Sequence, residues 1–356
     1  MRTIPVDLIR TIAIVGVIVL HAANEAIAPQ MMTQTETIRW IMVDIYQTLG
    51  RTGVPLFVML TGALLLQPSK VEPLSVFFKK RWSRIGLPFL FWGTIYFAWD
   101  YFADHIALTT SFIAQGILSG PYYHFWYLYM LLGLYLLTPI LRVVVAHIDR
   151  KTFKYFLVVW FLGVFILPIP PLFGAYHLDS NVLTIPFWVG YFILGVYLLD
   201  VKIRRRVLVC LMTLGLVLTA AGTYAIAATV GGPHIYYFHD YFSPTMILAA
   251  TMLFLLLTSV KAPADTNQTK TNQIEAPQPK PNWLLKQISS CTLGIFLFHV
   301  IVLETLQRGY LWGFTISGNT MNSIIEVPLI TVVTLFICLA VLLPLKKVPF
   351  IKRLIG

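Results

Sequence analysis

The stretch Arg10–His21 reads RTIAIVGVIVLH, ten uncharged and mostly apolar residues between an arginine and a histidine. The apolar and small residues continue as far as Ala28, which approaches the length of about 20 residues that a membrane-spanning helix needs. In a helix, Arg10 and His21 are separated by about 16 Å along the axis and by only about 20° around it. The stretch therefore predicts a membrane helix with two ionisable side chains on one face.

The composition extends this prediction to the whole chain. Of the 356 residues, 58% are hydrophobic and 12% are charged, against about 45–50% apolar and about 25% charged residues in soluble domains. These values exclude disordered, collagen-like and disulfide-stapled proteins. Cys210, Cys291 and Cys338 all lie in apolar segments without the spacing of metal ligands or redox pairs. We therefore expect an all-α, polytopic integral membrane protein without a metal site.

Long charge-free runs set the expected architecture, because a charge inside a membrane helix is costly. We expect about ten transmembrane helices in a single transmembrane domain, residues 1–356, with both termini cytoplasmic. The expected spans centre on Thr11–Ala28, Thr52–Gln67, Ile85–Phe102, His124–Leu141, Tyr155–Pro170, Val182–Leu199, Val207–Val230, Phe242–Ser259, Ser290–Leu306 and Ile324–Leu343.

The basic residues determine the expected orientation, because Lys and Arg are retained on the cytoplasmic side. With the N-terminus inside, only Arg39, Arg51 and Arg308 of the 26 lysines and arginines fall in outer loops. The formal net charge of +11 would point to nucleic acid in a soluble protein. Here the positive charge lies between apolar runs, so we expect the lipid bilayer, and no nucleic acid, as its partner.

Three segments need a separate interpretation. Positions 261–282 are rich in Pro, Gln, Asn, Thr and Lys, which predicts a flexible cytoplasmic linker between helices 8 and 9. Ile38–Gly50 has a helical apolar period, which suits either an interfacial helix or an early start of the second span. Thr11–Leu20 also resembles the apolar region of a signal peptide. Its removal would leave nine spans and would disturb the alternation between basic cytoplasmic loops and outer loops with few basic residues. We therefore expect it to be retained.

The polar residues of the first helix form one stripe. Asp7 and Glu25 extend the face of Arg10 and His21, and such a stripe should line a cavity rather than face lipid. Taken singly, Arg10 is explained as a topological anchor and His21 as a hydrogen-bonding residue between helices. Together they favour function, because a neutral imidazole can take a proton from an alcohol near pH 7 and the Glu25 carboxylate could orient it.

A basic cluster, Lys79-Lys80-Arg81-Trp82-Ser83-Arg84, lies at the expected cytoplasmic mouth of the third span. Arg81 and Arg84 are three residues apart, so they share a helix face and can bind phosphate oxygens. Charge alone favours the commoner use of such clusters, which is to hold anionic lipid.

Several blocks of the sequence resemble the acyltransferase-3 family of integral-membrane acyltransferases, particularly the branch that O-acetylates surface polysaccharides. Arg10 and His21 resemble the family's Arg-x10-His signature, and Arg81-x-x-Arg84 precedes the third helix as in the family. The blocks follow one another over nearly the whole chain, and their order is more specific than any one of them. The remaining blocks are Pro55–Gly62, Phe125–Leu128 with Gly133–Tyr135 and Pro139, and Leu293–His299.

The resemblance implies an O-acyltransferase that takes an acyl group, usually acetyl, from cytoplasmic acyl-CoA. It implies that His21 is catalytic, either as the base that deprotonates the acceptor hydroxyl or as a transient acceptor of the acyl group. It also implies that Arg10 is the partner of His21 in the donor cavity and that Arg81 and Arg84 bind the phosphates of CoA. Lys79 and Lys80 could add positive charge there, although the family's motifs have no counterpart for them. Acetyl-CoA is then a co-substrate, and no bound cofactor is expected.

The resemblance also implies an acceptor, a hydroxyl of a cell-surface glycan or lipid-linked glycan, and residence in the cytoplasmic membrane of the cell. We expect no extracytoplasmic hydrolase-like domain of the kind that some relatives carry, so a separate extracytoplasmic partner protein is an open alternative. Glu304 is equally open to an acceptor-side function and to structural pairing. His299, an orienting or acceptor-side candidate, lies about 140° from Glu304 around the helix. Tyr122–Tyr127 favours an interfacial aromatic belt over a sugar platform.

Two other functions remain open on the residues alone. A proton-coupled transporter or flippase of a glycan or lipid could use His21, Glu25 and Glu304 as a proton relay. No internal repeat supports that class. A non-catalytic scaffold would leave the polar stripe of the first helix unexplained.

Overall fold

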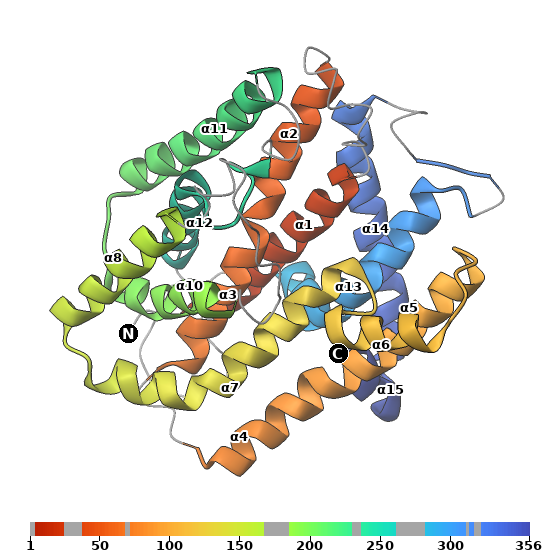
Figure 1. Cartoon of the computed structure of the whole chain (residues 1–356), viewed down its shortest axis with the longest axis horizontal. Helices are drawn as coiled ribbons and strands as arrows, with labels where there is room; N and C mark the ends of the chain where they lie inside the picture. Colours follow the sequence, from red (N-terminus) through yellow and green to blue (C-terminus); the bar gives the residue numbers. More distant parts are fainter. Residues whose placement is uncertain are drawn as a thin grey trace, which may run out of the picture.

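The computed structural model describes residues 4–24, 38–67, 72–166, 185–229, 236–260, 282–310, 313–316 and 322–356. Glu25 and positions 261–281 of the expected linker lie outside the described residues. The described chain is built from helices (Figure 1). Their bounds are α1 (Val6–Asn24), α2 (Ile38–Arg51), α3 (Gly53–Leu65), α4 (Leu74–Arg81), η3 (Trp82–Gly86), α5 (Leu87–Phe102), α6 (Thr110–Ser119), η4 (Tyr123–Phe125), α7 (Trp126–His147), α8 (Arg150–Ile166), α10 (Ile185–Tyr197), η5 (Leu198–Asp200), α11 (Arg205–Thr229), α12 (Pro244–Thr258), α13 (Trp283–Gln307), α14 (Ser323–Leu345) and α15 (Pro349–Ile355).

The central element of the bundle is α1, with α2, α3, α13 and α14 packed around it (Figure 1). The side chains of Ile9, Ala13, Ile14, Val17 and Ile18 are almost completely buried in these contacts. A helix that is apolar around most of its surface suits such a position. The polar stripe of α1 is therefore surrounded by protein and not by lipid.

The backbones of α1 and of the α2–α3 pair approach very closely. A Cβ atom added at Gly53 would lie 2.5 Å from the carbonyl oxygen of Ala13, and one at Gly50 would lie 2.7 Å from that of Gly16. Small residues allow membrane helices to pack at this distance. The two glycines thus fix the position of α1 along its neighbours.

Six stretches of the described chain are long and apolar enough to cross a membrane. This confirms the all-α, membrane-spanning class, while the count of ten spans and the cytoplasmic termini stay predictions. The second stretch begins at Ile38, which favours the early start of the second span and places Arg51 inside it. The stretches are Val6–Ala23, Ile38–Leu65, Thr110–His147, Arg205–Thr229, Trp283–Gln307 and Ile324–Leu345, beside the shorter apolar helices Pro186–Asp200 and Pro244–Thr258.

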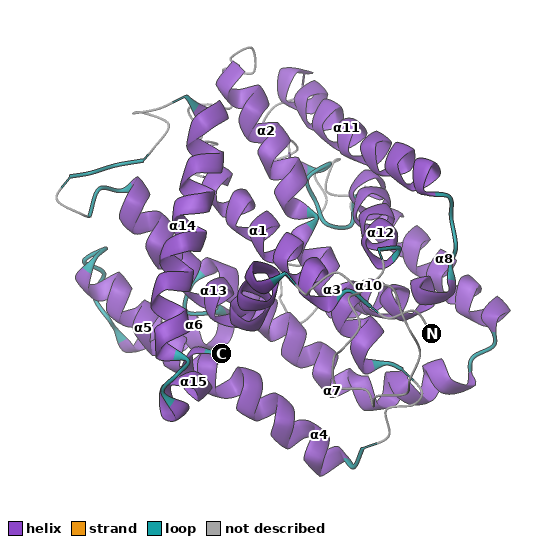
Figure 2. Ribbon diagram, turned by 180° about the vertical axis from the view of Figure 1, so that it is seen from behind, coloured by secondary structure: helices purple, strands orange, loops and turns teal. Residues whose placement is uncertain are grey.

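The outer surface of the bundle is apolar. Leu136 and Ile140 of α7 are 66% and 63% exposed, and Val332 and Phe336 of α14 are 65% and 70% exposed. Figure 2 shows α14 from behind, beside α1 and α13. Exposed apolar side chains on peripheral helices match a lipid environment, in which only polar groups are costly to expose.

The third expected span contains a change of helix type. The chain is helical from Leu74 to Phe102, with a π-helical turn, Trp82–Gly86, between α4 and α5. Such turns are rare and occur frequently at functional sites. This one carries Arg84 and directly follows Arg81, the two arginines of the basic cluster.

Candidate active site

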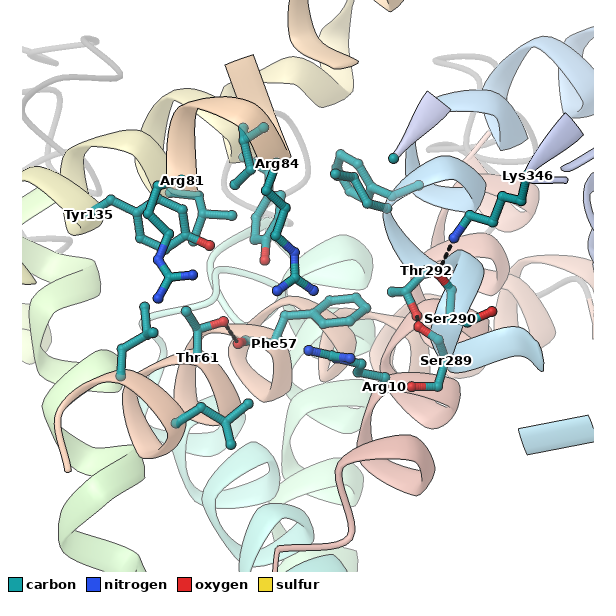
Figure 3. A pocket seen from close by; sticks show the side chains of 18 residues that line it. Arg10, Phe57, Thr61, Arg81, Arg84, Tyr135, Ser289, Ser290, Thr292 and Lys346 are labelled. Atoms are coloured by element: carbon teal, nitrogen blue, oxygen red, sulfur yellow. Dashed lines mark hydrogen bonds between the residues drawn. The ribbon is translucent and has the colours of Figure 1, made fainter. Parts of the chain in front are cut away.

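A cavity of about 210 Å³ lies among α1, α3, α7, α13 and the π turn. Its polar lining is dominated by the side chains of Arg10, Arg81, Arg84 and Lys346. The side chains of Arg81 and Arg84 extend in the same direction into the cavity, and that of Arg10 reaches it from α1 (Figure 3). The concentration of four cations in one cavity indicates an anionic ligand with several charges.

Arg81 is held by aromatic rings and by one carboxylate. Its guanidinium carbon lies 4.9 Å from the ring centroid of Phe77 and 5.7 Å from that of Tyr135. Its Nη2 atom is 3.9 Å from a carboxylate oxygen of Glu72. Stacking on aromatic faces suits arginine and leaves the edge of the guanidinium available for hydrogen bonds. Arg81 therefore presents its donors to the cavity in a defined orientation.

The Glu72 carboxylate contacts several cations of this region. It accepts a hydrogen bond of 2.8 Å from Lys80 Nζ and lies 3.5 Å from Arg142 Nη2. These cations, Lys80 first, lower the pKa of the Glu72 carboxyl below its ordinary value. Lys80 is thus occupied by Glu72, and Lys79 is exposed; neither lines the cavity. Of the four residues expected to bind CoA, only Arg81 and Arg84 line the cavity.

Lys346 is a cavity residue that sequence reasoning missed. It follows the end of α14, donates a hydrogen bond to the carbonyl oxygen of Ser290, and lies opposite the arginines (Figure 3). Burial lowers the pKa of its amine below the ordinary value. In the sequence it belongs to a basic C-terminal segment that resembles any topological anchor, so nothing local distinguishes it.

Two aromatic rings close the inner end of the cavity. Phe296 of α13 and Tyr127 of α7 both line it, with ring centroids 5.0 Å apart. The Phe296 ring lies 5.5 Å from the ring of His124 and 5.9 Å from that of His299. Phe296 therefore connects the lining of the cavity directly with two buried histidines.

His21 and His299 form the centre of this histidine group. The Nδ1 atom of His21 is 2.7 Å from Nε2 of His299, and the two rings stack with centroids 5.0 Å apart. Nδ1 of His299 lies 2.7 Å from the carbonyl oxygen of Phe296 and 3.1 Å from that of Ile295. A carbonyl oxygen only accepts, so this nitrogen is the donor in His299.

The hydrogen bonds assign the protons of a neutral pair. Because Nδ1 of His299 carries the hydrogen, its Nε2 accepts, and Nδ1 of His21 must donate to it. The remaining nitrogen of His21, Nε2, then holds a free lone pair. The arrangement prepares His21 as a base or a nucleophile.

The geometry of this site can be compared with known protein families. The family described as an acyltransferase domain matches residues 5–343. The chain belongs to the acyltransferase-3 family. No curated protein and no solved structure matches the chain. Membership in this family, together with the apolar helices, makes the protein a membrane acyltransferase.

In this acyltransferase-3 protein, Glu304 is fully engaged. Its carboxylate accepts hydrogen bonds from Trp99 Nε1 at 2.9 Å and from the Tyr122 hydroxyl at 2.5 Å. It also lies 3.3 Å from Arg308 Nη2, one turn further along α13. Of the two interpretations of Glu304, these partners favour structural pairing. The contacts fix α13, and with it His299, against α5 and the segment before α7.

The structure groups the predicted residues differently from the sequence. Arg10 and His21, on one face of α1, serve opposite ends of the site: Arg10 lines the cavity and His21 contacts His299 beyond its inner end. His124 is a further member that sequence reasoning assigned to an aromatic belt. The local sequence around it is rich in aromatic residues, and only the contact with α1 and α13 reveals a site.

Proposed function

We propose that this membrane acyltransferase transfers an acetyl group from cytoplasmic acetyl-CoA to a hydroxyl of a cell-surface glycan or lipid-linked glycan, with His21 as general base. The observation that carries the proposal is the His21–His299 hydrogen bond, placed beyond the inner end of a cavity whose mouth is lined by cations. A donor with a charged end and a reactive end fits this polarity.

The cationic end suits the phosphates of CoA. Arg81 and Arg84 provide planar donors that bind phosphate oxygens in pairs, and Lys346 adds a third charge from the opposite wall. Arg10 lies about 16 Å from His21 along α1, and helix side chains tilt toward the N-terminus. Arg10 therefore belongs to donor binding and is too distant to touch the same carbonyl group as His21.

The chemistry follows from the tautomer of His21. Nε2 takes the proton of the acceptor hydroxyl, and the hydroxyl oxygen attacks the thioester carbonyl carbon. The C–S bond breaks, and the leaving CoA thiolate accepts from His21 the proton that came from the acceptor hydroxyl. His299 keeps Nδ1 of His21 protonated and the ring in place throughout. A trapped acyl group on His21 would contradict this direct route.

Among the described residues, the contacts of Glu304 favour acyl transfer over the transporter alternative. A proton relay would need Glu304 to gain and lose protons during transport. Its carboxylate instead holds Trp99, Tyr122 and Arg308 together.

The experiment is acetyl-CoA binding and slow thioester cleavage by detergent-purified protein, which needs no knowledge of the acceptor. We expect Arg81→Ala/Arg84→Ala to lose saturable binding, and His21→Ala to bind normally but to lose cleavage. The matched control is Lys79→Ala/Lys151→Ala, which removes two exposed cations outside the cavity and should change neither quantity. Absence of binding by folded wild-type protein would contradict the proposal.

A further inference from the structure

His124 lies in the most unusual polar environment of the described protein. Its side chain is 1% exposed, and neither ring nitrogen has a hydrogen-bond partner among the described residues. Buried polar groups are almost always hydrogen-bonded, because an unmade bond costs free energy that water would otherwise recover. A buried imidazole without a hydrogen-bond partner, next to two other histidines, therefore requires an explanation.

The surroundings of His124 offer it no protein partner. Its ring lies 5.0 Å from the ring of Tyr96 and 5.7 Å from that of His299. The Tyr96 hydroxyl donates to the carbonyl oxygen of Leu297, and Nδ1 of His299 donates to its own helix. Tyr96 and His299 are therefore committed elsewhere, and since neither nitrogen of His124 has a hydrogen-bond partner among the described residues, the N–H of a neutral His124 is left to a ligand.

The position of His124 indicates which ligand atom it meets. Its ring is 6.5 Å from the ring of His21 and 5.5 Å from the ring of Phe296, which lines the inner end of the donor cavity. A group that reaches past Phe296 from the cavity therefore meets both His124 and His21. A reacting carbonyl needs both a base-activated nucleophile and an oxyanion donor at about 3 Å.

We propose that His124 is the oxyanion donor of the acyl transfer: its ring N–H binds the thioester carbonyl oxygen while His21 activates the acceptor hydroxyl. This inference rests on the proposed function. As the hydroxyl oxygen adds to the carbonyl carbon, negative charge moves to the carbonyl oxygen, and the His124 N–H stabilises it. When the C–S bond breaks, the charge passes to the thiolate, which takes the proton from His21. A preorganised donor in a dry site is effective for such a charge.

Arg10 does not suit this role, because it lies about 16 Å from His21 along the axis of α1. Arg51 adds positive charge near His21, and its Nε atom is also buried without a hydrogen-bond partner. Its guanidinium carbon lies 5.6 Å from the ring centroid of Tyr241, however, and its side chain is only half-buried, whereas His124 is fully buried. Among the described residues around His21, His124 combines full burial with uncommitted nitrogens. The carbonyl oxygen of an acyl group is therefore the acceptor that would satisfy the N–H of His124.

The kinetic test compares His124→Leu, which removes the donor, with His124→Gln, which keeps an N–H. Loss of one oxyanion donor lowers kcat by about 10²- to 10³-fold. We expect this loss for acetyl-CoA cleavage by His124→Leu, with KM unchanged, and a loss of less than about tenfold for His124→Gln. The control is His147→Gln, an exposed histidine at the end of α7, the helix that follows η4, and this variant should behave as wild type.

A spectroscopic measurement separates catalysis from structure. The infrared carbonyl stretch of bound, ¹³C-labelled acetyl-CoA should lie at lower frequency in wild type and His124→Gln than in His124→Leu. Equal frequencies in wild type and His124→Leu, or wild-type turnover by His124→Leu, would overturn the inference. Lost acetyl-CoA binding in both His124 variants would also overturn it, as a purely structural role. If the wild type itself failed to bind acetyl-CoA, the proposed function would fail and not this step alone.

Discussion

At the residue scale, the chemistry of the site depends on which nitrogen of each histidine carries a hydrogen. The carbonyl oxygen of Phe296 decides this for His299, and His299 decides it for His21. The chain of two hydrogen bonds begins on the backbone of α13, where the carbonyl group cannot change its role. This is the same logic as in catalytic triads, where a third group holds the base in its productive tautomer.

The role of His299 can be tested by substitution. His299→Leu removes the acceptor for Nδ1 of His21, so the imidazole loses its orientation and its preferred tautomer. We expect kcat for acetyl-CoA cleavage to fall by more than tenfold, on the order of the contribution of a general base or its orienting group. His299→Gln offers an amide oxygen and should recover most of the activity. Equal activity of the Leu and Gln variants would contradict the tautomer assignment, and unchanged acetyl-CoA binding in both is the control.

The sequence predicts one part of this site and misses another for a physical reason. Arg10 with His21, and Arg81 with Arg84, share helix faces, and helical periodicity alone establishes that. His21, His124 and His299 come from helices far apart in the chain. Helical periodicity shows which residues share one face of a helix, but it does not show which other helix packs against that face. His124 also follows Tyr122 and Tyr123, so the local pattern favours an interfacial aromatic belt. Only tertiary packing shows that its nitrogens are buried and unmatched.

At the element scale, α1 sets the distance between donor binding and chemistry. Its Arg10 end lines the cavity and its His21 end reaches the histidine group, so any shift of α1 along its neighbours displaces both ends together. The helix is held by α13 on one side and by the glycine contacts with α2 and α3 on the other. The precision of the site therefore depends on how closely these backbones pack.

Gly53→Val tests this dependence. The new Cβ atom would meet the carbonyl oxygen of Ala13 at 2.5 Å, and backbone cannot yield as a flexible side chain does. We expect a destabilisation of about 1–3 kcal/mol, typical of overpacking, seen as a lower Tm in detergent together with reduced acetyl-CoA cleavage. Gly163→Ala in α8 is the matched control, since a Cβ there has no neighbour within 4 Å. An unchanged Tm and activity for Gly53→Val would show that α1 is not fixed by this contact.

At the scale of the whole molecule, the two ends of the site differ: the cations lie at one end and the histidines at the other. The cavity with its four cations opens near the N-terminal end of α1 and the end of α14, and the histidines lie deeper along α1. The distribution of lysines and arginines predicts that the same ends of these helices lie on the cytoplasmic side. The four cations of the cavity belong to this distribution, so the cavity position and the predicted topology agree on the side from which an anionic donor is expected to enter.

This agreement predicts sidedness of donor use. In sealed proteoliposomes, acetyl-CoA is too charged to cross the bilayer and should be cleaved only by molecules whose cavity faces the added substrate. We expect detergent lysis to raise cleavage by about the share of molecules facing the other way. Protease access to positions 261–281, which the sequence predicts to be a cytoplasmic linker, determines this share separately. In the protease-resistant population, intact vesicles should show no cleavage. Cleavage by that population would place the donor entrance on the opposite face from the basic loops and contradict the expected topology, while leaving the roles of His21 and His299 untouched.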